Sequence, residues 1–514
     1  MKLLLLFVFL NACNAIYYNS STSSPPPPPH ILLLITDQFR YDAWSPLTTP
    51  NLYNLSQSPS STTFTKAYSS TPTCTPSRAG LLTGRGPWNH GMLGYDSEVD
   101  CLSYPTTLPS SLPSHYQTFV SGKDHFGTYP NGTFISQGYQ NLQLYDGLTE
   151  EIDHYDQFFK SKMGPDIDPM ATGNLSWNSW RGAPYIYEEN LHPTSWTSER
   201  AINYLQNFDF SSSSSSKMFL KASFHRPHSP YDPPKRLYDK YTSMSPSSPT
   251  LKRNINPGTW DDKFKNTTEM PAEAWNGDPG EEEGFISRAS YLASVEFVDE
   301  GIGAILDEIN EQGLMDDFFI VWVADHGDMN GDHNLWRKGY PYEESAHVPM
   351  VIKMDGEGGG AKVVDSVVEI RDVAVTVWDV VGVLEEVKEK DTLINGLSLL
   401  PLLTGEKTEV RDYIDLEHNQ VYNSTIHWNA LVSNNGVKYI YNAWDGTEML
   451  FNLTADPREA NDLKDKQPEL VKEWRTKLIQ MFEDEGRGEE WVKEGELVER
   501  RDASLEHSLN FPCL

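Results

Sequence analysis

The 514-residue sequence predicts an α/β fold with a large, mostly parallel central sheet flanked by helices, followed by a smaller C-terminal α+β domain with an antiparallel sheet. Three continuous apolar runs carry this prediction; they begin at Ile31, Met218 and Phe319. Short unbroken apolar runs are typical of strands buried on both faces of a parallel sheet. Polar residues follow each run. Because open α/β sheets place their sites at the carboxyl ends of strands, these three ends are expected to meet.

The N-terminal segment, residues 1–15, indicates a secretory signal peptide. It has one positive charge, a short apolar run and small residues ending at Ala15. The run is too short to span a bilayer. A bacterial lipoprotein signal at Cys13 is the competing interpretation, although Asn11 fits it poorly. We therefore expect a protein of the secretory pathway, extracellular or lysosomal, with no transmembrane segment. Residues 16–29 form a polar lead rich in Ser and Pro.

The main domain is expected over residues 30–405. Within it, residues 286–310 carry apolar side chains close to helical spacing. Residues 211–216 are a serine homopolymer and predict a surface loop. Residues 240–284, rich in Pro, Ser, Asn and Glu, predict an irregular insertion over the site.

A C-terminal subdomain is expected over residues 406–514. Residues 438–441 and 448–453 have the pattern of strands, and residues 456–463 lead into a helix. The last thirty residues are charged and have no assigned structure. No internal repeat is visible along the chain.

The composition is that of a globular protein, with 38% hydrophobic residues and a formal net charge of −32. This charge argues against a nucleic-acid partner, because the phosphate backbone repels such a surface. An anionic substrate must therefore be held by a local cluster of cations. Asn-x-Ser/Thr triplets, typical of glycosylated secreted proteins, occur at Asn54, Asn131, Asn174, Asn266, Asn423 and Asn452, with a marginal one at Asn19.

The four cysteines have different expected fates. Cys13 lies in the signal segment, and Cys74 begins the most informative stretch of the chain. Cys101 and Cys513 either pair in an oxidising compartment or remain two buried thiols, because the sequence does not show whether they are close.

Cys74 opens the motif Cys-Thr-Pro-Ser-Arg, and Leu82-Thr83-Gly84-Arg85 follows a few residues later. This stretch resembles the signature of type I sulfatases, which have the alkaline-phosphatase-like fold. The resemblance implies that a formylglycine-generating enzyme reads residues 75–78 and oxidises Cys74 to Cα-formylglycine. The hydrate of this aldehyde attacks sulfate esters through one hydroxyl, and its collapse through the second hydroxyl expels sulfate. A serine or an unmodified cysteine lacks that second hydroxyl.

Asp37, Gln38, Asp325 and His326 follow two of the predicted strands. The resemblance implies that they bind one divalent cation, usually Ca²⁺, together with an oxygen of residue 74. Carboxylate and amide oxygens suit such a hard cation. Many family members have Asp in place of Gln38 and Asn in place of His326. The pairs found here resemble the branch with phosphonate monoester hydrolases and choline sulfatases, and an imidazole ligand favours Mn²⁺ more than an all-oxygen site does.

Five further residues match catalytic positions of the family. Arg78 would hold the hydrate, and Lys123 in Gly-Lys-x-His-x-Gly would bind a sulfate oxygen. His125 would help deprotonate the hydrate. His228, in Pro-His-x-Pro, would contact the sulfate or the leaving oxygen, and Lys338 matches a second sulfate-binding lysine. We expect His228 and Lys338 to share protonation of the departing alcohol.

The resemblance runs from about residue 30 to about residue 482. Four other histidines receive no role in the site: His90, His225, His333 and His347. The leading hypothesis is a secreted sulfatase that acts on a sulfated small molecule or a glycan, with carbohydrate sulfates suggested by secretion alone. A phosphonate monoester or phosphodiester hydrolase is the alternative. A non-catalytic glycan-binding protein is the third hypothesis, and the intact candidate residues argue against it.

Overall fold

The computed structural model describes residues 28–95, 104–126, 134–147, 153–169, 175–211, 215–265, 270–355, 362–419, 421–422, 426–501 and 507–512. The predicted signal segment, Cys101, Cys513 and the triplets at residues 19, 131, 174, 266 and 423 lie outside these residues.

An eight-stranded sheet forms the centre of the molecule, with the order β4-β3-β5-β1-β6-β7-β2-β8. Its strands are β1 (His30–Asp37), β2 (Ser61–Tyr68), β3 (Tyr116–Gly122), β4 (Asn141–Leu144), β5 (Lys217–Pro227), β6 (Phe318–Ala324), β7 (His347–Lys353) and β8 (Lys362–Glu369). Only β7 among them pairs antiparallel with its neighbours. The predicted fold class, a mostly parallel sheet, is confirmed.

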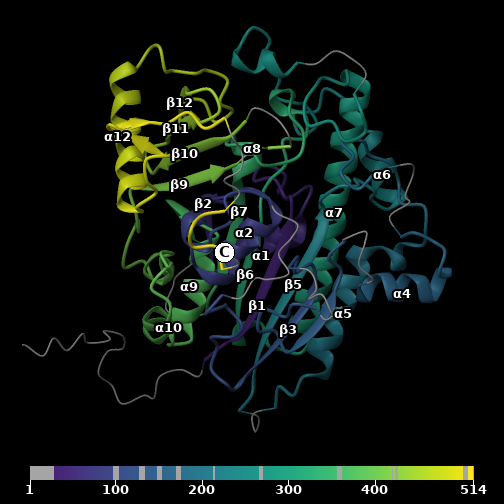
Figure 1. Cartoon of the computed structure of the whole chain (residues 1–514). Helices are drawn as coiled ribbons and strands as arrows, with labels where there is room; N and C mark the ends of the chain where they lie inside the picture. Colours follow the sequence, from purple (N-terminus) through teal and green to yellow (C-terminus); the bar gives the residue numbers. More distant parts are fainter. Residues whose placement is uncertain are drawn as a thin grey trace, which may run out of the picture.

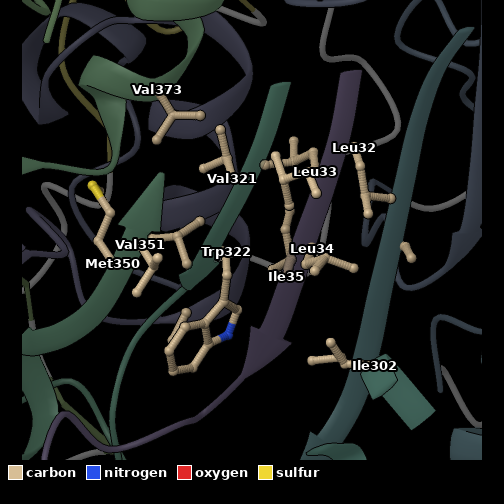
Figure 2. Packing of buried hydrophobic residues seen from close by; sticks show 14 of the residues in the cluster. Leu32, Leu33, Leu34, Ile35, Ile302, Val321, Trp322, Met350, Val351 and Val373 are labelled. Carbon is tan, nitrogen blue, oxygen red and sulfur yellow. The ribbon is translucent and has the colours of Figure 1, made fainter. Parts of the chain in front are cut away.

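The three apolar runs lie side by side at the middle of this sheet. β1 pairs in parallel with β5 and with β6, so that Ile31 lies opposite both Phe219 and Phe319. β5 runs as far as Pro227, several residues beyond the apolar run that predicted it. Figure 2 shows Ile302 and Val373 in the same core, with β1 and β6 between them. Strands covered on both faces explain why these runs are largely apolar; Lys221, the charged exception in β5, is buried and paired with Asp124.

Helices lie around this sheet, except for α12, which packs against the smaller sheet described below (Figure 1). They are α1 (Pro50–Gln57), α2 (Cys74–Thr83), α3 (Pro87–His90), α4 (His154–Met163), α5 (Pro193–Asn207), α6 (Lys235–Thr242), α7 (Glu281–Glu311), α8 (Glu343–Ala346), α9 (Arg371–Val380), α10 (Leu384–Lys390), α11 (Leu400–Leu403) and α12 (Pro468–Asp484). α5 and α7 pack against β5, whereas α2 packs against α9. α7 is the helix predicted over residues 286–310, and it starts about one turn earlier. Short 3-10 turns occur at Glu189–Leu191, Trp260–Phe264, Met315–Asp317 and Asp332–Asn334.

A second, antiparallel sheet follows, with the order β12-β11-β10-β9. It contains β9 (Tyr413–His418), β10 (Trp428–Ser433), β11 (Val437–Asn442) and β12 (Thr447–Asn452), and a two-stranded ribbon, β13 (Val492–Lys493) and β14 (Glu496–Leu497), comes after α12. Leu431 and Tyr439 pack with Leu478 of α12, while Ile440 packs with Tyr342 of the main domain. The predicted antiparallel sheet with a helix is confirmed, and the domain boundary at residue 405 stays a prediction.

The C-terminal segment, residues 507–512, returns to the main domain. Phe511 packs with Ala79 and Leu82 of α2, and the Ser508 amide donates to the Gly91 carbonyl at 2.8 Å. In Figure 1 the end of the chain lies in front of α2. A Cβ on Gly91, whose φ is +89°, would lie 2.3 Å from Cα of Phe511, so only glycine permits this approach.

No described helix combines the length and the apolar character that crossing a membrane would require.

Candidate active site

The ends of four parallel strands bring the predicted site residues together. Asp37 ends β1, Asp325 follows β6, Lys123 follows β3 and His228 follows β5. The ten predicted residues are all buried, at no more than 8% exposure: Asp37, Gln38, Cys74, Arg78, Lys123, His125, His228, Asp325, His326 and Lys338. Residues hundreds of positions apart in sequence thus meet at the sheet edge where the fold class predicts a site.

Cys74 is the first residue of α2 and lies at the centre of this cluster. Its Sγ is 2.9 Å from Nζ of Lys338, 3.3 Å from Nε2 of His326 and 3.6 Å from Nζ of Lys123. Burial opposes ionisation of the thiol, but Lys123 and Lys338 lower the pKa of Cys74 well below its usual value. The start of a helix also favours negative charge. Position 74 is therefore built to hold an anion.

Four side chains around this position could hold a metal ion. Asp37, Cys74, Asp325 and His326 each offer one ligand atom, and these atoms lie within 4.8 Å of one another. Gln38 adds an amide oxygen: its Nε2 donates to Oδ2 of Asp328 at 2.6 Å, and its buried Oε1 has no hydrogen-bond partner.

The chemistry of this donor set fits a divalent cation. Two carboxylates and an unsatisfied amide oxygen are ligands that Ca²⁺ and Mn²⁺ accept. Nδ1 of His326 donates to the Gly327 carbonyl at 2.9 Å, which turns Nε2 towards Oδ1 of Asp37 at 3.4 Å. A histidine ligand is usually oriented in this way, through a hydrogen bond of its other nitrogen.

Arg78 lies one helical turn after Cys74 and binds the carboxylates of the cluster. Its Nε and Nη2 lie 2.9 and 2.8 Å from Oδ2 of Asp325, and Nη2 is 3.7 Å from Oδ2 of Asp37. Its Nη1 donates to the Lys123 carbonyl and to Ser223 Oγ, both at 3.0 Å. In this structure Arg78 fixes the acidic residues beside position 74.

Gly122 allows β3 to deliver Lys123 and His125. A Cβ at Gly122 would lie 2.0 Å from the Ser223 carbonyl oxygen, and its φ is +92°. Lys123 then reaches Oδ2 of Asp37 at 2.5 Å. Burial, and then Lys123, lower the pKa of His125 to about 4, so this imidazole is neutral near pH 7 and can accept a proton.

His228 and Lys338 differ in their protonation. Nδ1 of His228 donates to the Ser229 carbonyl at 2.8 Å, and burial followed by Lys338 lowers the pKa of this histidine to about 3. Burial opposes the charge on Lys338, but Cys74 and Asp37 raise the pKa of the ammonium above its usual value. Of the two, Lys338 is the group that carries a proton near pH 7.

β9 of the C-terminal sheet and the segment after it contribute contacts that the sequence motifs did not indicate. Nε2 of His418, at the end of β9, lies 3.1 Å from Oγ1 of Thr73, the residue before Cys74. The Lys338 amide donates to the Tyr422 hydroxyl at 3.4 Å, and Arg337 lies 3.9 Å from the centre of the Tyr422 ring. These residues occur in no local motif, and only the packing of the two sheets brings them to the site.

Comparison with known protein families identifies the family of this chain. Residues 29–383 match the family model described as Sulfatase. The chain belongs to the sulfatase family. Residues 331–484 of the sulfatase also match the model described as N-sulphoglucosamine sulphohydrolase, C-terminal.

Curated relatives agree over most of their length. The sulfatase is 34% identical over 425 residues to an arylsulfatase of Clostridium perfringens, with 78% of this chain and 82% of the relative covered. It is 28% identical over 429 residues to a choline-sulfatase of Rhizobium meliloti, with 80% and 77% covered. The chain is a sulfuric ester hydrolase, so the hypothesis of a non-catalytic protein is wrong.

Solved structures share the alkaline-phosphatase-like fold. The phosphonate monoester hydrolase of Agrobacterium radiobacter has a TM-score of 0.67 at 22% identity, with 92% of this chain and 100% of that chain covered. A protein solved in complex with its substrate D-glucosamine-2-N,6-O-disulfate has a TM-score of 0.66 at 21% identity, with 90% and 99% covered. At this identity the likeness supports the fold alone.

Lys338→Met should lower kcat for sulfate release about 10²- to 10³-fold, because a preorganised cation beside the reacting group is lost. Methionine keeps most of the side-chain volume, so the fold should persist. The matched control is Lys390→Met, at a lysine that is 62% exposed, which should leave kcat unchanged. Steady-state sulfate release from an aryl sulfate measures both. If the Lys338→Met variant kept the wild-type kcat, Lys338 would have no role in the reaction.

Proposed function

We propose that this sulfatase hydrolyses carbohydrate sulfates through Cys74 after its conversion to Cα-formylglycine. The position of Cys74 carries the proposal: it starts a helix, lies within 3.6 Å of two ammonium groups and borders two carboxylates. Such a setting binds an anionic oxygen nucleophile and a sulfate group close together. The match of the chain to the sulfatase model over residues 29–383 supports the same reaction class.

One divalent cation completes the proposed site, Ca²⁺ or alternatively Mn²⁺. Asp37, Gln38, Asp325, His326 and the side chain of residue 74 would hold it. When bound, the cation supplies positive charge that favours the ionised form of an oxygen nucleophile.

Side chains of the protein bind the sulfate group and transfer protons. Lys123 and Lys338 bind the sulfate oxygens, and Arg78 keeps Asp325 in place. His125, neutral at pH 7, accepts the proton that leaves the modified residue 74. Lys338 supplies a proton to the departing alcohol, and His228 contacts the same oxygen through Nε2, because its Nδ1 is already bonded to Ser229.

Carbohydrate sulfates are proposed on two grounds. The signal segment indicates the secretory pathway, with an extracellular or lysosomal destination. Relatives at 25–26% identity carry the names N-acetylglucosamine-6-O-sulfatase, from Bacteroides thetaiotaomicron, and iduronate 2-sulfatase, from Homo sapiens.

A phosphonate monoester or phosphodiester hydrolase is the second candidate. Gln38 and His326, the two residues that depart from the commoner sulfatase pattern, both lie in the cluster around Cys74. Their placement is the specific observation in favour of this candidate.

Two measurements test the proposal. Mass spectrometry of the tryptic peptide Ala67–Arg78, from protein of the native source, should show an aldehyde or its hydrate at Cys74. The same protein should turn over an aryl sulfate faster than the matching aryl phosphodiester by orders of magnitude, and should release sulfate from sulfated sugars. An intact thiol, or a preference for the phosphodiester, would contradict the proposal.

A further inference from the structure

A second buried cluster of potential metal ligands lies apart from the residues assigned above. His333, Glu344 and Glu459 each offer one ligand atom, and the three atoms lie within 4.8 Å of one another. All three side chains are no more than 2% exposed. They come from the turn at Asp332–Asn334, from α8 and from the loop after β12, so the cluster joins the main domain to the C-terminal part.

The orientation of His333 prepares its ring for a ligand role. Its Nδ1 is 2.8 Å from Oδ2 of Asp261, so this nitrogen donates to a carboxylate. Its Nε2 faces Oε2 of Glu344 across 3.8 Å, which is too long for a hydrogen bond, and Nδ2 of Asn254 lies 3.5 Å from the same nitrogen, at the limit of hydrogen bonding. A carboxylate on one ring nitrogen with the other nitrogen facing further ligands is the usual arrangement around a metal-binding histidine.

The side chain of Glu344 independently indicates that a ligand binds at this cluster. Its Oε2 is buried and has no hydrogen-bond partner. A buried carboxylate oxygen without a partner is costly, and native structures rarely leave one in this state. Two ligands of a zinc-sized ion, each about 2.0–2.2 Å from it, are separated by a distance similar to the gap between Glu344 and His333.

Several buried carboxylates gather around the cluster. Four buried carboxylates belong to it: Asp261, Glu343, Glu344 and Glu459. Lys438, which lies 2.8 Å from Glu459 and 3.0 Å from Glu343, supplies one positive charge. His333 and His347 could supply two more, and Nδ1 of His347 lies 2.9 Å from Oε2 of Glu343. Arg288 pairs with the neighbouring Asp42 and Asp332. Arg40, which also acts on Glu344, is already paired with Asp42 and Asp332.

We propose that His333, Glu344 and Glu459 bind a second divalent cation of the zinc or manganese class, separate from the ion at Asp37 and Asp325. One imidazole with two carboxylates suits these metals better than it suits Ca²⁺. Asp261 orients the His333 ring through its contact with Nδ1, and Lys438 forms an ion pair with Glu459.

The position of the cluster gives such an ion a structural task. The amide of Gly327, the residue after His326, donates to the Ser345 carbonyl at 2.8 Å, and a Cβ on Gly327 would lie 2.1 Å from the Glu344 carbonyl oxygen. The backbone of α8 therefore lies directly against the loop that carries Asp325 and His326. An ion on Glu344 would fix that loop and the C-terminal part in one arrangement. The inference does not depend on the proposed substrate or on the modification of Cys74.

The test counts bound zinc in the full-length protein after loading with Zn²⁺ and dialysis. In an Asp325→Asn background, which weakens the first site, we expect about one zinc per chain and an X-ray absorption spectrum with one imidazole ligand. Adding Glu344→Gln should remove that zinc. Adding Glu386→Gln instead, at a glutamate that is 67% exposed, should leave it in place and controls for loose binding to the acidic surface.

Crystals of the zinc-loaded wild-type protein give a readout that does not depend on any variant. An anomalous peak at the zinc edge between Nε2 of His333 and Oε2 of Glu344 is expected. A crystal with no peak there would overturn the proposal. Zinc that persists after Glu344→Gln would overturn it as well. A failure to release sulfate would affect only the proposed function.

Discussion

Cys74→Ala will lower kcat for sulfate ester hydrolysis by about 10⁴-fold or more, because the group that becomes the nucleophile is removed while the surrounding cations remain. Alanine differs from cysteine by one sulfur atom, so the buried start of α2 should tolerate the change. Continuous measurement of sulfate release, with the thermal midpoint of unfolding as a check on folding, tests the expectation. Turnover within tenfold of wild type would place the nucleophile elsewhere.

Cys74→Ser separates the nucleophile from the modified residue. A serine hydroxyl can attack sulfate once, but it lacks the second hydroxyl that expels sulfate from the modified residue. We expect at most one equivalent of alcohol released per chain, followed by arrest with a sulfated residue 74. Intact-protein mass spectrometry after exposure to substrate would detect that adduct. Sustained multiple turnover by Cys74→Ser would contradict the need for the modification.

Arg78→Met will damage both stability and activity. Arg78 is 1% exposed and lies 2.8 Å from Asp325 and 3.7 Å from Asp37. Removing one partner of a buried ion pair leaves uncompensated charge, which costs about 3–5 kcal/mol in the free energy of unfolding. Since the freed carboxylates also lose their fixed positions beside residue 74, kcat should fall as well.

The stability of Arg78→Met is best compared with that of Arg236→Met. Arg236 binds Glu189 and Glu300 but is 47% exposed, so its ion pairs are screened by water and should contribute less than about 1 kcal/mol. Urea-induced unfolding of both variants gives the comparison. Equal urea midpoints of unfolding for the two variants would contradict the prediction. They would show that a bound cation, and not Arg78, neutralises the negative charge of Asp37 and Asp325.

Much of the fold and the grouping of the candidate residues follow from local sequence. The runs at Ile31, Met218 and Phe319 are largely apolar because both faces of their strands are covered, and this pattern is visible without a structure. Parallel strands in one sheet then bring their carboxyl ends together. Asp37, His228 and Asp325 meet for this reason, although they are far apart in the chain.

Other features depend on contacts that no local pattern records. His418 reaches Thr73 only because β9 packs beside the main domain, and the sequence around it resembles any short strand. His333 had no assigned role, because a histidine in a polar turn has no periodicity and its partners Asp261, Glu344 and Glu459 come from three separate segments. The docking of Phe511 on α2 was missed for the same reason, since a single aromatic residue near the end of a charged stretch indicates nothing about its neighbours.

The burial of Cys74 has a consequence for the proposed modification of this residue. In the folded protein this residue is 2% exposed, and residues 507–512 lie against its helix. Under the proposed maturation, an enzyme that reads residues 75–78 would need these buried residues to be exposed, as they are in the unfolded chain. Under the proposed maturation, a chain that folds with its thiol intact stays inactive for as long as it stays folded. The fraction of active protein then depends on the rate of Cys74 oxidation relative to the rate of folding.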